Sequence, residues 1–175
     1  MTLIVDASVV VKWFSPEAGW DEAAQLMRQP LSAPDSLVPE CVNALRRKVL
    51  RGHMSLEDAM NAAHVLARAG IACESTQPLA AEILELSTRL SLTAYDCAYL
   101  ALARELDGVL ITADTRLLER CRRPDAADLA NCVRSLFDDP PMVQERPVRP
   151  YIARRHPPRA RSHAASAAVL AKRFS

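Results

Sequence analysis

The stretch GVLITADTRLL covers residues 108–118 and carries the strongest strand signal in the chain. Its first part, Val109–Thr112, is apolar and mostly β-branched, which predicts a buried β-strand. Asp114 follows the strand after one residue, and Leu117 and Leu118 then fit a short helix. The segment therefore predicts a strand, an acid at the carboxyl end of that strand, and a helix, in this order.

The same order of strand and helix recurs along the chain. Short apolar runs predict further strands at residues 3–5, 31–33, 71–73 and 131–136. Amphipathic stretches predict helices at residues 7–14, 20–28, 39–51, 55–69 and 78–90, and one more that Thr93 caps. Strands that alternate with helices are typical of the α/β class, in which helices cover both faces of a parallel sheet.

Four acids lie where these elements begin or end: Asp6, Glu40, Asp96 and Asp114. Asp6 and Asp114 each follow a predicted strand, whereas Glu40 and Asp96 lie early in predicted helices. Ligands of open α/β sheets bind outside the carboxyl ends of the strands, so we expect the four acids to converge there. Clustered carboxylates repel one another unless a divalent cation lies between them, which predicts metal-dependent chemistry.

Charge and composition divide the chain into two parts. Residues 1–138 carry 14 Lys and Arg against 19 Asp and Glu, a net charge of −5. Residues 139–175 carry 8 against 2, a net charge of +6, and contain proline at six positions. We expect an α/β domain over 1–138 and a flexible, basic, Pro- and Arg-rich tail over 139–175. The tail is interpreted either as a solubilising segment or as an electrostatic contact for RNA.

The five cysteines are odd in number and form no CxxC pair. Four histidines show no ligand spacing with them, so a zinc site is not expected. Free thiols are typical of a reducing compartment, and we expect a cytoplasmic protein. The N-terminal apolar run is broken by Asp6 and lacks a basic region before it, so no signal peptide is expected. No stretch approaches the length of a transmembrane helix, so no membrane association is expected.

Four motifs together resemble the PIN domain, in particular the toxin ribonuclease of VapBC toxin–antitoxin pairs. They are DASVVVKWF, LVPECVNAL, LTAYDCAYLALA and LITADTRLL, which begin at residues 6, 37, 92 and 110. The resemblance covers about residues 1–136 and implies a three-layer α/β/α sandwich with a central parallel sheet. It also implies an endoribonuclease that depends on Mg²⁺ or Mn²⁺, a small antitoxin that covers the active site, and a homodimer.

The resemblance implies a role for individual residues. The four acids match the family's acidic site, with Asp6, Asp96 and Asp114 as ligands of the principal metal and Glu40 as a ligand of a second metal or the residue that orients the attacking water. Thr112, Ser8 and Asn43 match polar positions that line the same pocket. Water as the nucleophile would leave a 5′-phosphate and a 3′-hydroxyl. The tail after residue 138 has no counterpart in the family pattern.

Some interpretations remain open on the sequence alone. Basic residues near the acids, among them Arg46, Arg47 and Arg116, are either a solvated surface or a rim that guides RNA phosphates. A phosphoryl-transfer domain of the haloacid dehalogenase type is a second enzyme class, but its Asp-x-Asp motif is replaced here by Asp6-Ala7-Ser8. A catalytically inactive PIN-like scaffold is the non-enzymatic alternative.

Overall fold

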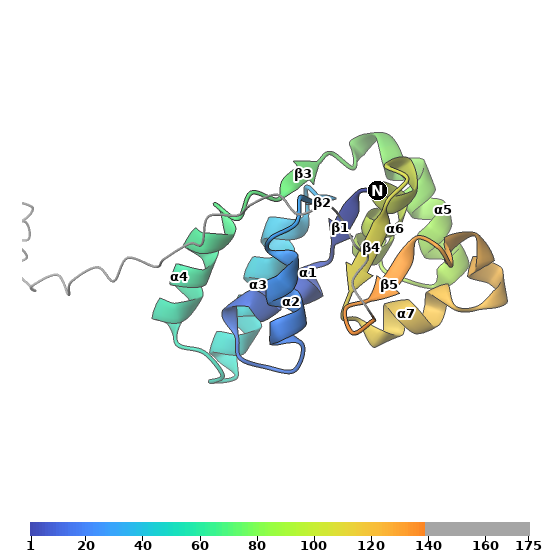
Figure 1. The fold of residues 1–175 in the computed structure, drawn as a ribbon. Helices are drawn as coiled ribbons and strands as arrows, with labels where there is room; N and C mark the ends of the chain where they lie inside the picture. The colour runs from blue at the N-terminus through green and yellow to red at the C-terminus, as the bar shows by residue number, and fades with distance from the viewer. Residues whose placement is uncertain (139–175) are drawn as a thin grey trace, which may run out of the picture.

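Five parallel strands form the centre of the molecule in the computed structural model, which describes residues 1–138 (Figure 1). In chain order they are β1 (Leu3–Val5), β2 (Leu31–Pro34), β3 (Ala72–Glu74), β4 (Val109–Thr112) and β5 (Val133–Ser135). Their order across the sheet is β3-β2-β1-β4-β5. The predicted basic tail lies outside the described residues.

Helices cover both faces of this sheet, which confirms the predicted three-layer α/β/α sandwich (Figure 1). Helix α6 packs against β1, β2 and β4, with α5 outside it, while α1 and α3 pack together on the other side. The α-helices are α1 (Ala7–Val10), α2 (Trp20–Leu26), α3 (Leu37–Leu50), α4 (Leu56–Leu66), α5 (Ala80–Leu90), α6 (Ala94–Glu105) and α7 (Thr115–Cys121). Three 3₁₀ segments complete the described part: η1 (Val11–Phe14), η2 (Gln77–Leu79) and η3 (Pro124–Leu129).

The two central strands form the most completely buried part of the sheet. Every residue of β1 and β4 is buried, and the two strands pair in register from Leu3 with Val109 to Val5 with Ile111. Strands buried on both faces appear in sequence as continuous apolar runs, which is why both were predicted with the correct bounds. The outer strand β3 lies one residue later than predicted, because its side chains are largely exposed and its apolar signal is weak.

Most predicted helices are present, with shifts at their ends. Helix α3 begins at Leu37, two residues before the predicted start at Pro39. Pro39 still lies in the first turn, where the backbone N–H groups have no partner within the helix. Ser55 caps α4 by accepting a hydrogen bond from the N–H of Asp58, as its sequence pattern predicts. No helix among residues 1–138 is long and apolar enough to cross a membrane.

The amino ends of the central strands meet closely at Gly108. A Cβ atom at this position would lie 2.5 Å from Cδ1 of Ile4 and 2.7 Å from the carbonyl oxygen of Thr2. The N–H of Val109 donates to the same carbonyl group of Thr2 at 2.9 Å. Glycine is therefore required here so that the strand β4 can begin directly beside the start of β1.

Candidate active site

Asp6 is a buried acid at the carboxyl end of β1, with 9% of its surface exposed. It is also the N-cap of α1, because its Oδ1 accepts a hydrogen bond from the N–H of Ser8 at 3.1 Å. Its Oδ2 accepts from the Ser8 hydroxyl at 2.9 Å and from the hydroxyl of Thr112. Both oxygens of this carboxylate are thus held in place by neighbouring donors.

Thr112 connects the ends of the two central strands. It is fully buried at the last position of β4, and its hydroxyl donates to Asp6 on the neighbouring strand β1. The same oxygen accepts from the N–H of Asp114 at 3.0 Å. Ser8 makes a similar link, since its hydroxyl oxygen accepts from the N–H of Ala113 at 3.1 Å. The two hydroxyls therefore fix the backbone before Asp114 relative to Asp6.

Asp114 is half-buried and forms the N-cap of α7. Its Oδ1 accepts hydrogen bonds from the N–H groups of Arg116 at 2.8 Å and Leu117 at 3.1 Å. A carboxylate at this end of a helix is stabilised by the unpaired N–H groups there. The bonds leave the other oxygen, Oδ2, without a hydrogen bond from residues 1–138.

Glu40 lies in the first turn of α3 and is half-buried. Its Oε1 accepts from the Ser36 hydroxyl at 2.6 Å and from the Tyr99 hydroxyl at 3.3 Å. Burial raises the pKa of Glu40, the hydrogen bond from Ser36 opposes this rise, and the negative charges of Asp6 and Asp96 add to it. The pKa of Glu40 is therefore affected by the charges of acids on two other elements of the fold.

Asp96 belongs to the first turn of α6 and takes part in a reciprocal cap with Thr93. The Thr93 hydroxyl oxygen accepts from the N–H of Asp96 at 3.1 Å, and Oδ2 of Asp96 accepts from the N–H of Thr93 at 3.3 Å. This arrangement stabilises the start of α6 and fixes the position of the half-buried carboxylate there. The charge of Asp96 acts on Glu40.

The pKa of Asp6 is shifted by several groups of the site. Burial raises the pKa of Asp6, hydrogen bonds from Thr112 and Ser8 lower it, and the charge of Asp114 raises it further. Asp6 therefore interacts electrostatically with Asp114 and with Glu40, and Glu40 interacts with Asp96. The four acids form a chain of like charges along the carboxyl edge of the sheet.

The donor atoms of this edge suit a hard divalent cation. They are carboxylate and hydroxyl oxygens, and a positive charge among them would relieve the repulsion between the acids. Within residues 1–138, however, no three His, Cys, Asp or Glu side chains are placed so that they could hold a metal ion. Mg²⁺ usually binds proteins through one or two carboxylates, with water and substrate phosphate as the other ligands. The acids fit this mode better than an all-protein cage.

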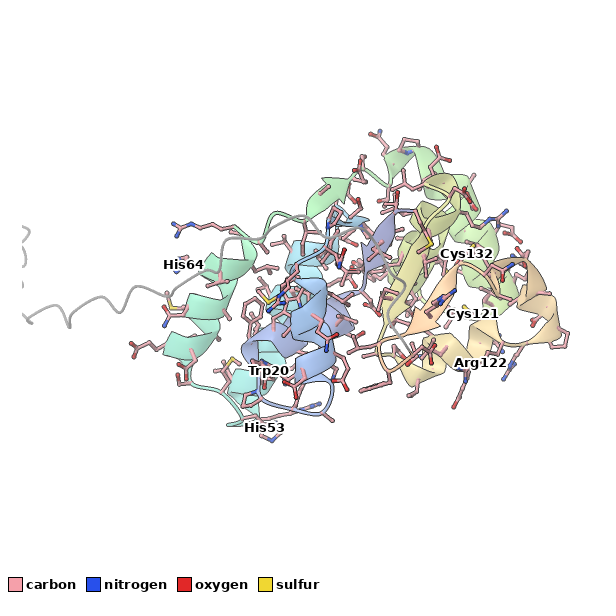
Figure 2. All side chains as sticks on the ribbon, viewed as in Figure 1. Trp20, His53, His64, Cys121, Arg122 and Cys132 are labelled. Carbon is pink, nitrogen blue, oxygen red and sulfur yellow. The ribbon has the colours of Figure 1, made fainter. Side chains whose placement is uncertain are left out.

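Two histidines lie among residues 1–138, and both are remote from two of the cysteines. Figure 2 shows His53 and His64 on the side of α4, far from Cys121 and Cys132 on the side of α7 and β5. All five cysteines lie within residues 1–138 and are free thiols. Burial raises the pKa of the Cys121 thiol to about 11, so this thiol is not activated as a nucleophile or ligand.

Comparison with known proteins gives the family to which this arrangement belongs. The PIN domain family matches residues 3–123, more than half of the chain. The chain belongs to the PIN domain family. Ribonuclease VapC3 of Pyrobaculum aerophilum is 29% identical over 124 residues, which cover 69% of this chain and 95% of that protein. Ribonuclease VapC1 of Mycobacterium tuberculosis is 35% identical over 121 residues, covering 65% and 86%.

A solved structure agrees with the fold of this PIN domain. The crystal structure of PAE2754 from Pyrobaculum aerophilum superimposes with a TM-score of 0.58 at 22% sequence identity, covering 78% of this chain and 84% of that one. The curated relatives make this chain a VapC-type PIN domain. The haloacid dehalogenase alternative is not favoured, since the family match is to the PIN domain.

Other residues predicted for the PIN site lie outside the network around Asp6. Asn43 is exposed on α3, and its side chain makes no hydrogen bond with residues 1–138. Arg46 and Arg47 are also exposed on α3. Arg116 donates to the backbone carbonyl oxygen of Ser91 at 3.4 Å, which ties α7 to the end of α5. The side chains of these four residues thus form no hydrogen bond with the acids within residues 1–138, although the backbone N–H of Arg116 donates to Asp114.

Two partners of Glu40 were missed by sequence reasoning. Tyr99 is a buried residue of α6, and its hydroxyl donates a hydrogen bond to Glu40. Ser36 precedes Glu40 by four residues and stands just before α3, a spacing that can place two side chains in contact. This spacing is the signal that could have identified Ser36. Nothing in the sequence connects Tyr99 to a residue 59 positions away.

Proposed function

We propose that this PIN domain is a metal-dependent endoribonuclease that acts as the toxin of a toxin–antitoxin pair. The observation that carries the proposal is the desolvated carboxylate of Asp6, which two hydroxyls fix beside three further acids. A buried carboxylate beside other negative charges lowers the stability of the folded protein, which favours a functional role over a structural one. The names of the curated VapC relatives support RNA as the substrate and a toxin role.

Asp6, Asp96 and Asp114 are the proposed ligands of the principal divalent cation, and Glu40 would help to hold a second cation or orient the attacking water. A bound Mg²⁺ or Mn²⁺ would lower the pKa of the attacking water and stabilise the leaving oxygen. Ser8 and Thr112 hold the Asp6 carboxylate in one orientation, so that it need not reorganise when substrate arrives. Glu40, with its raised pKa, is positioned by Ser36 and Tyr99 to accept a proton from water.

Replacement of Asp6 tests this proposal most directly. Asp6→Asn keeps the shape of the side chain but removes its charge, and we expect cleavage to fall by more than the roughly 100-fold that loss of a supporting hydrogen bond produces. The assay incubates purified full-length protein with total RNA in Mg²⁺, in Mn²⁺ or in EDTA, and maps the new ends, where we expect a 5′-phosphate. Glu119→Gln is the matched control, an exposed acid on α7 that takes no part in the network.

The outcomes separate the proposal from its alternatives. Cleavage that persists in EDTA, or that Asp6→Asn leaves unchanged, would contradict the metal site. A wild-type protein that binds RNA but never cleaves it with either metal would identify an inactive scaffold. Loss of cleavage in both Asp6→Asn and Glu119→Gln would show a general effect of removing charge rather than a catalytic role.

An apolar groove between α3 and α4 supports the predicted antitoxin partner. It encloses about 330 Å³ and is lined by Val42, Leu45, Leu56 and Met60 among others. Leu56 is 65% exposed and Met60 is 55% exposed, which is a large apolar area for a surface. Such a groove suits the apolar face of a partner helix. The predicted homodimer and cytoplasmic location belong to the same proposal, and light scattering would measure the dimer.

A charge placed in this groove should prevent antitoxin binding. An antitoxin that inhibits RNA cleavage by the wild-type protein should not inhibit cleavage by the Met60→Glu variant. The reason is that burying a glutamate against Leu56 and Val42 is unfavourable. Leu84→Glu provides the control, since Leu84 is 67% exposed on the unrelated helix α5. Equal inhibition of the two variants would remove the groove from the account of the partner.

A further inference from the structure

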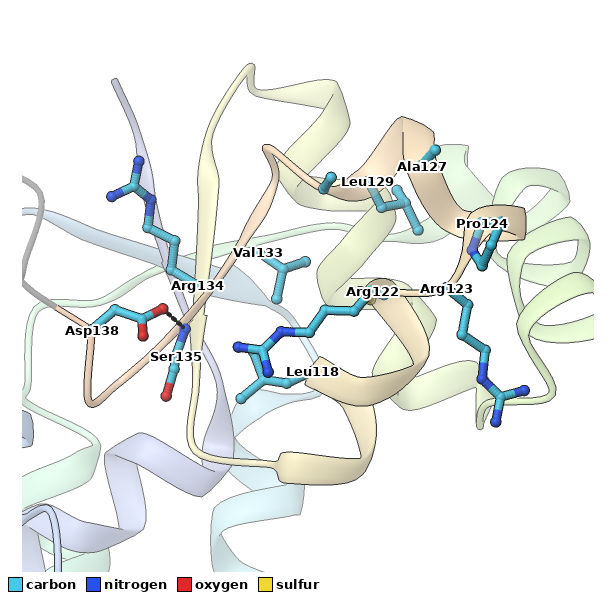
Figure 3. Close-up of a pocket in the computed structure, with 12 residues that line it drawn as sticks. Leu118, Arg122, Arg123, Pro124, Ala127, Leu129, Val133, Arg134, Ser135 and Asp138 are labelled. Carbon is cyan, nitrogen blue, oxygen red and sulfur yellow. Dashed lines mark hydrogen bonds between the residues drawn. The ribbon is translucent and has the colours of Figure 1, made fainter.

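A second cavity, of about 390 Å³, lies between α7, η3 and β5 (Figure 3). Its volume falls within the roughly 300–1,000 Å³ of typical small-ligand sites. Six of the residues that line it are Leu118, Arg122, Leu129, Val133, Ser135 and Asp138. None of the acids proposed for catalysis contributes to its wall.

The wall of this cavity combines an apolar part with a charged edge. Leu129 is fully buried behind the wall, Leu118 is 9% exposed and Val133 is half-buried, so the apolar surface open to the cavity comes from Leu118 and Val133. Figure 3 shows the Arg122 side chain extended past Leu118 toward β5, while the Arg123 side chain points away. Asp138 stands on the other side and accepts a hydrogen bond from the N–H of Ser135 at 3.0 Å.

Three arginines line this cavity, Arg122, Arg123 and Arg134, and none of them forms an ion pair or a side-chain hydrogen bond within residues 1–138, unlike the neighbouring arginines. Arg89 pairs with Glu85 and Asp128, and Arg104 pairs with Glu82. Arg116 and Arg120 donate to the carbonyl oxygens of Ser91 and Leu90 at the end of α5. Within residues 1–138, Arg122 makes neither an ion pair nor a hydrogen bond through its side chain, although the net charge of this part is −5. It is therefore a cation available for an external anion.

The cavity lies close to the acidic edge. The N–H of Leu136 donates to the carbonyl oxygen of Thr112 at 2.8 Å, so the end of β5 is tied to the end of β4. Helix α7 begins directly after Asp114, and Arg122 follows its last residue. At 1.5 Å per residue the two lie about 12 Å apart along the helix. This is the length of roughly three to four nucleotides at the 3.4 Å spacing of stacked bases.

We propose that this cavity binds one nucleotide of a single-stranded RNA substrate, a few nucleotides from the scissile bond. The base packs against Leu118 and Val133, and its phosphate pairs with Arg122. Single-stranded RNA is the form whose bases are free to enter pockets while the backbone follows positive charge. The inference rests on the proposed ribonuclease function and adds to it a substrate-binding subsite that is separate from the acids.

Two variants test the charged and the apolar part of the cavity separately. Arg122→Gln removes the charge with little loss of length, and Ala127→Trp fills the cavity from an exposed position of η3 without a change in charge. Arg68→Gln is the matched control, an exposed arginine after α4 that lies far from the cavity in the sequence and in the fold. Circular dichroism and thermal melting establish that each variant is folded.

The measurement is the fluorescence anisotropy of a labelled twelve-nucleotide RNA of mixed sequence, titrated with full-length protein in EDTA between 50 and 200 mM KCl. Arg122→Gln should weaken binding about ten-fold and reduce the slope of log affinity against log salt by about 0.7, the value for one lost phosphate contact to a single strand. Ala127→Trp should weaken binding by at least about five-fold through the lost base contact, with the slope unchanged. Arg68→Gln should bind as the wild type does.

The results distinguish failure of the cavity from failure of the ribonuclease. Wild-type protein that cleaves RNA, with Arg122→Gln and Ala127→Trp that bind like Arg68→Gln, overturns the cavity and leaves the ribonuclease intact. Equal weakening by Arg122→Gln and Arg68→Gln also overturns it, since the effect would then be one of net charge. Wild-type protein that neither binds nor cleaves RNA overturns both proposals.

Discussion

The two ends of the central strands β1 and β4 differ in how they are packed: one end is tightly packed and apolar, and the other buries polar groups. At the amino ends, Gly108 leaves no space for even a Cβ atom between Ile4 and the Thr2 carbonyl group. At the carboxyl ends, Asp6 and Thr112 bring polar groups into a buried position. Close packing stabilises the sheet at one end, whereas the other end accepts an unfavourable charge. One end of this pair of strands therefore stabilises the fold, and the other end carries the residues of the proposed reaction.

The largest effect is expected when the hydroxyl that supports Asp6 is removed. Thr112→Val keeps the shape of a buried side chain but removes the hydrogen bond to Asp6, and we expect RNA cleavage to fall by about 10–100-fold, as for other supporting partners of a metal ligand. Thr112→Ser keeps the hydroxyl and should retain most of the activity. The measurement is the cleavage rate in saturating Mg²⁺. Equal rates for the two variants would remove Thr112 from the site.

The opposite substitution at the amino end should affect stability and not chemistry. Gly108→Ala places a methyl group against the Thr2 backbone, and overpacking of this kind costs about 1–3 kcal/mol in the free energy of unfolding. Urea denaturation measures the loss, and the cleavage rate per folded molecule should stay within two-fold of the wild type, roughly the limit of a neutral change. Ala substitution at Gly52, where a Cβ would meet nothing within 4 Å but φ is +72°, separates steric contact from backbone strain. A stable Gly108→Ala protein would contradict the packing argument.

The charge at the carboxyl end predicts a pH dependence of stability in EDTA. Burial raises the pKa of Asp6 in the folded protein, so the folded state binds a proton more readily than the unfolded state does. Stability from Asp6 is therefore fully present below its ordinary pKa and is lost as the pH rises through the raised value. Asp6→Asn does not titrate, so the wild type should lose stability relative to this variant as the pH rises above about 4, the ordinary pKa of an aspartate. A constant difference across this range would show that Asp6 is not desolvated.

The smallest effect is expected at an ion pair distant from both ends of the strands. Arg89 of α5 pairs with Glu85 at 2.9 Å and with Asp128 of η3 at 2.9 Å. Because all three side chains are partly exposed, Arg89→Gln should lower the free energy of unfolding by about 0.5–1 kcal/mol at low salt, and less at high salt. Thermal unfolding at two salt concentrations measures it. A loss that does not depend on salt would indicate packing of the arginine stem instead.

The sequence predicts the buried parts of the fold well and its surface contacts poorly. The central strands, the caps at Ser55 and Thr93 and the placement of four acids at the ends of elements all follow from local patterns. Strand β3 was displaced by one residue because exposed side chains give a weak pattern. Local patterns also cannot reveal which residue a side chain meets across the fold. The pairing of Tyr99 with Glu40 and the cavity beside Arg122 therefore emerged only from the structure.

The hydrogen bond between Thr112 and Asp6 joins residues 106 positions apart, and it has a consequence for the order of synthesis. During translation β1 leaves the ribosome first, but β4, its partner at the centre of the sheet, follows only after most of the domain has been made. Contacts this distant in sequence form late and slowly. A chain that stops before residue 109 is therefore expected to cleave no RNA. The proposed nuclease site would therefore be assembled only near the end of translation of this chain.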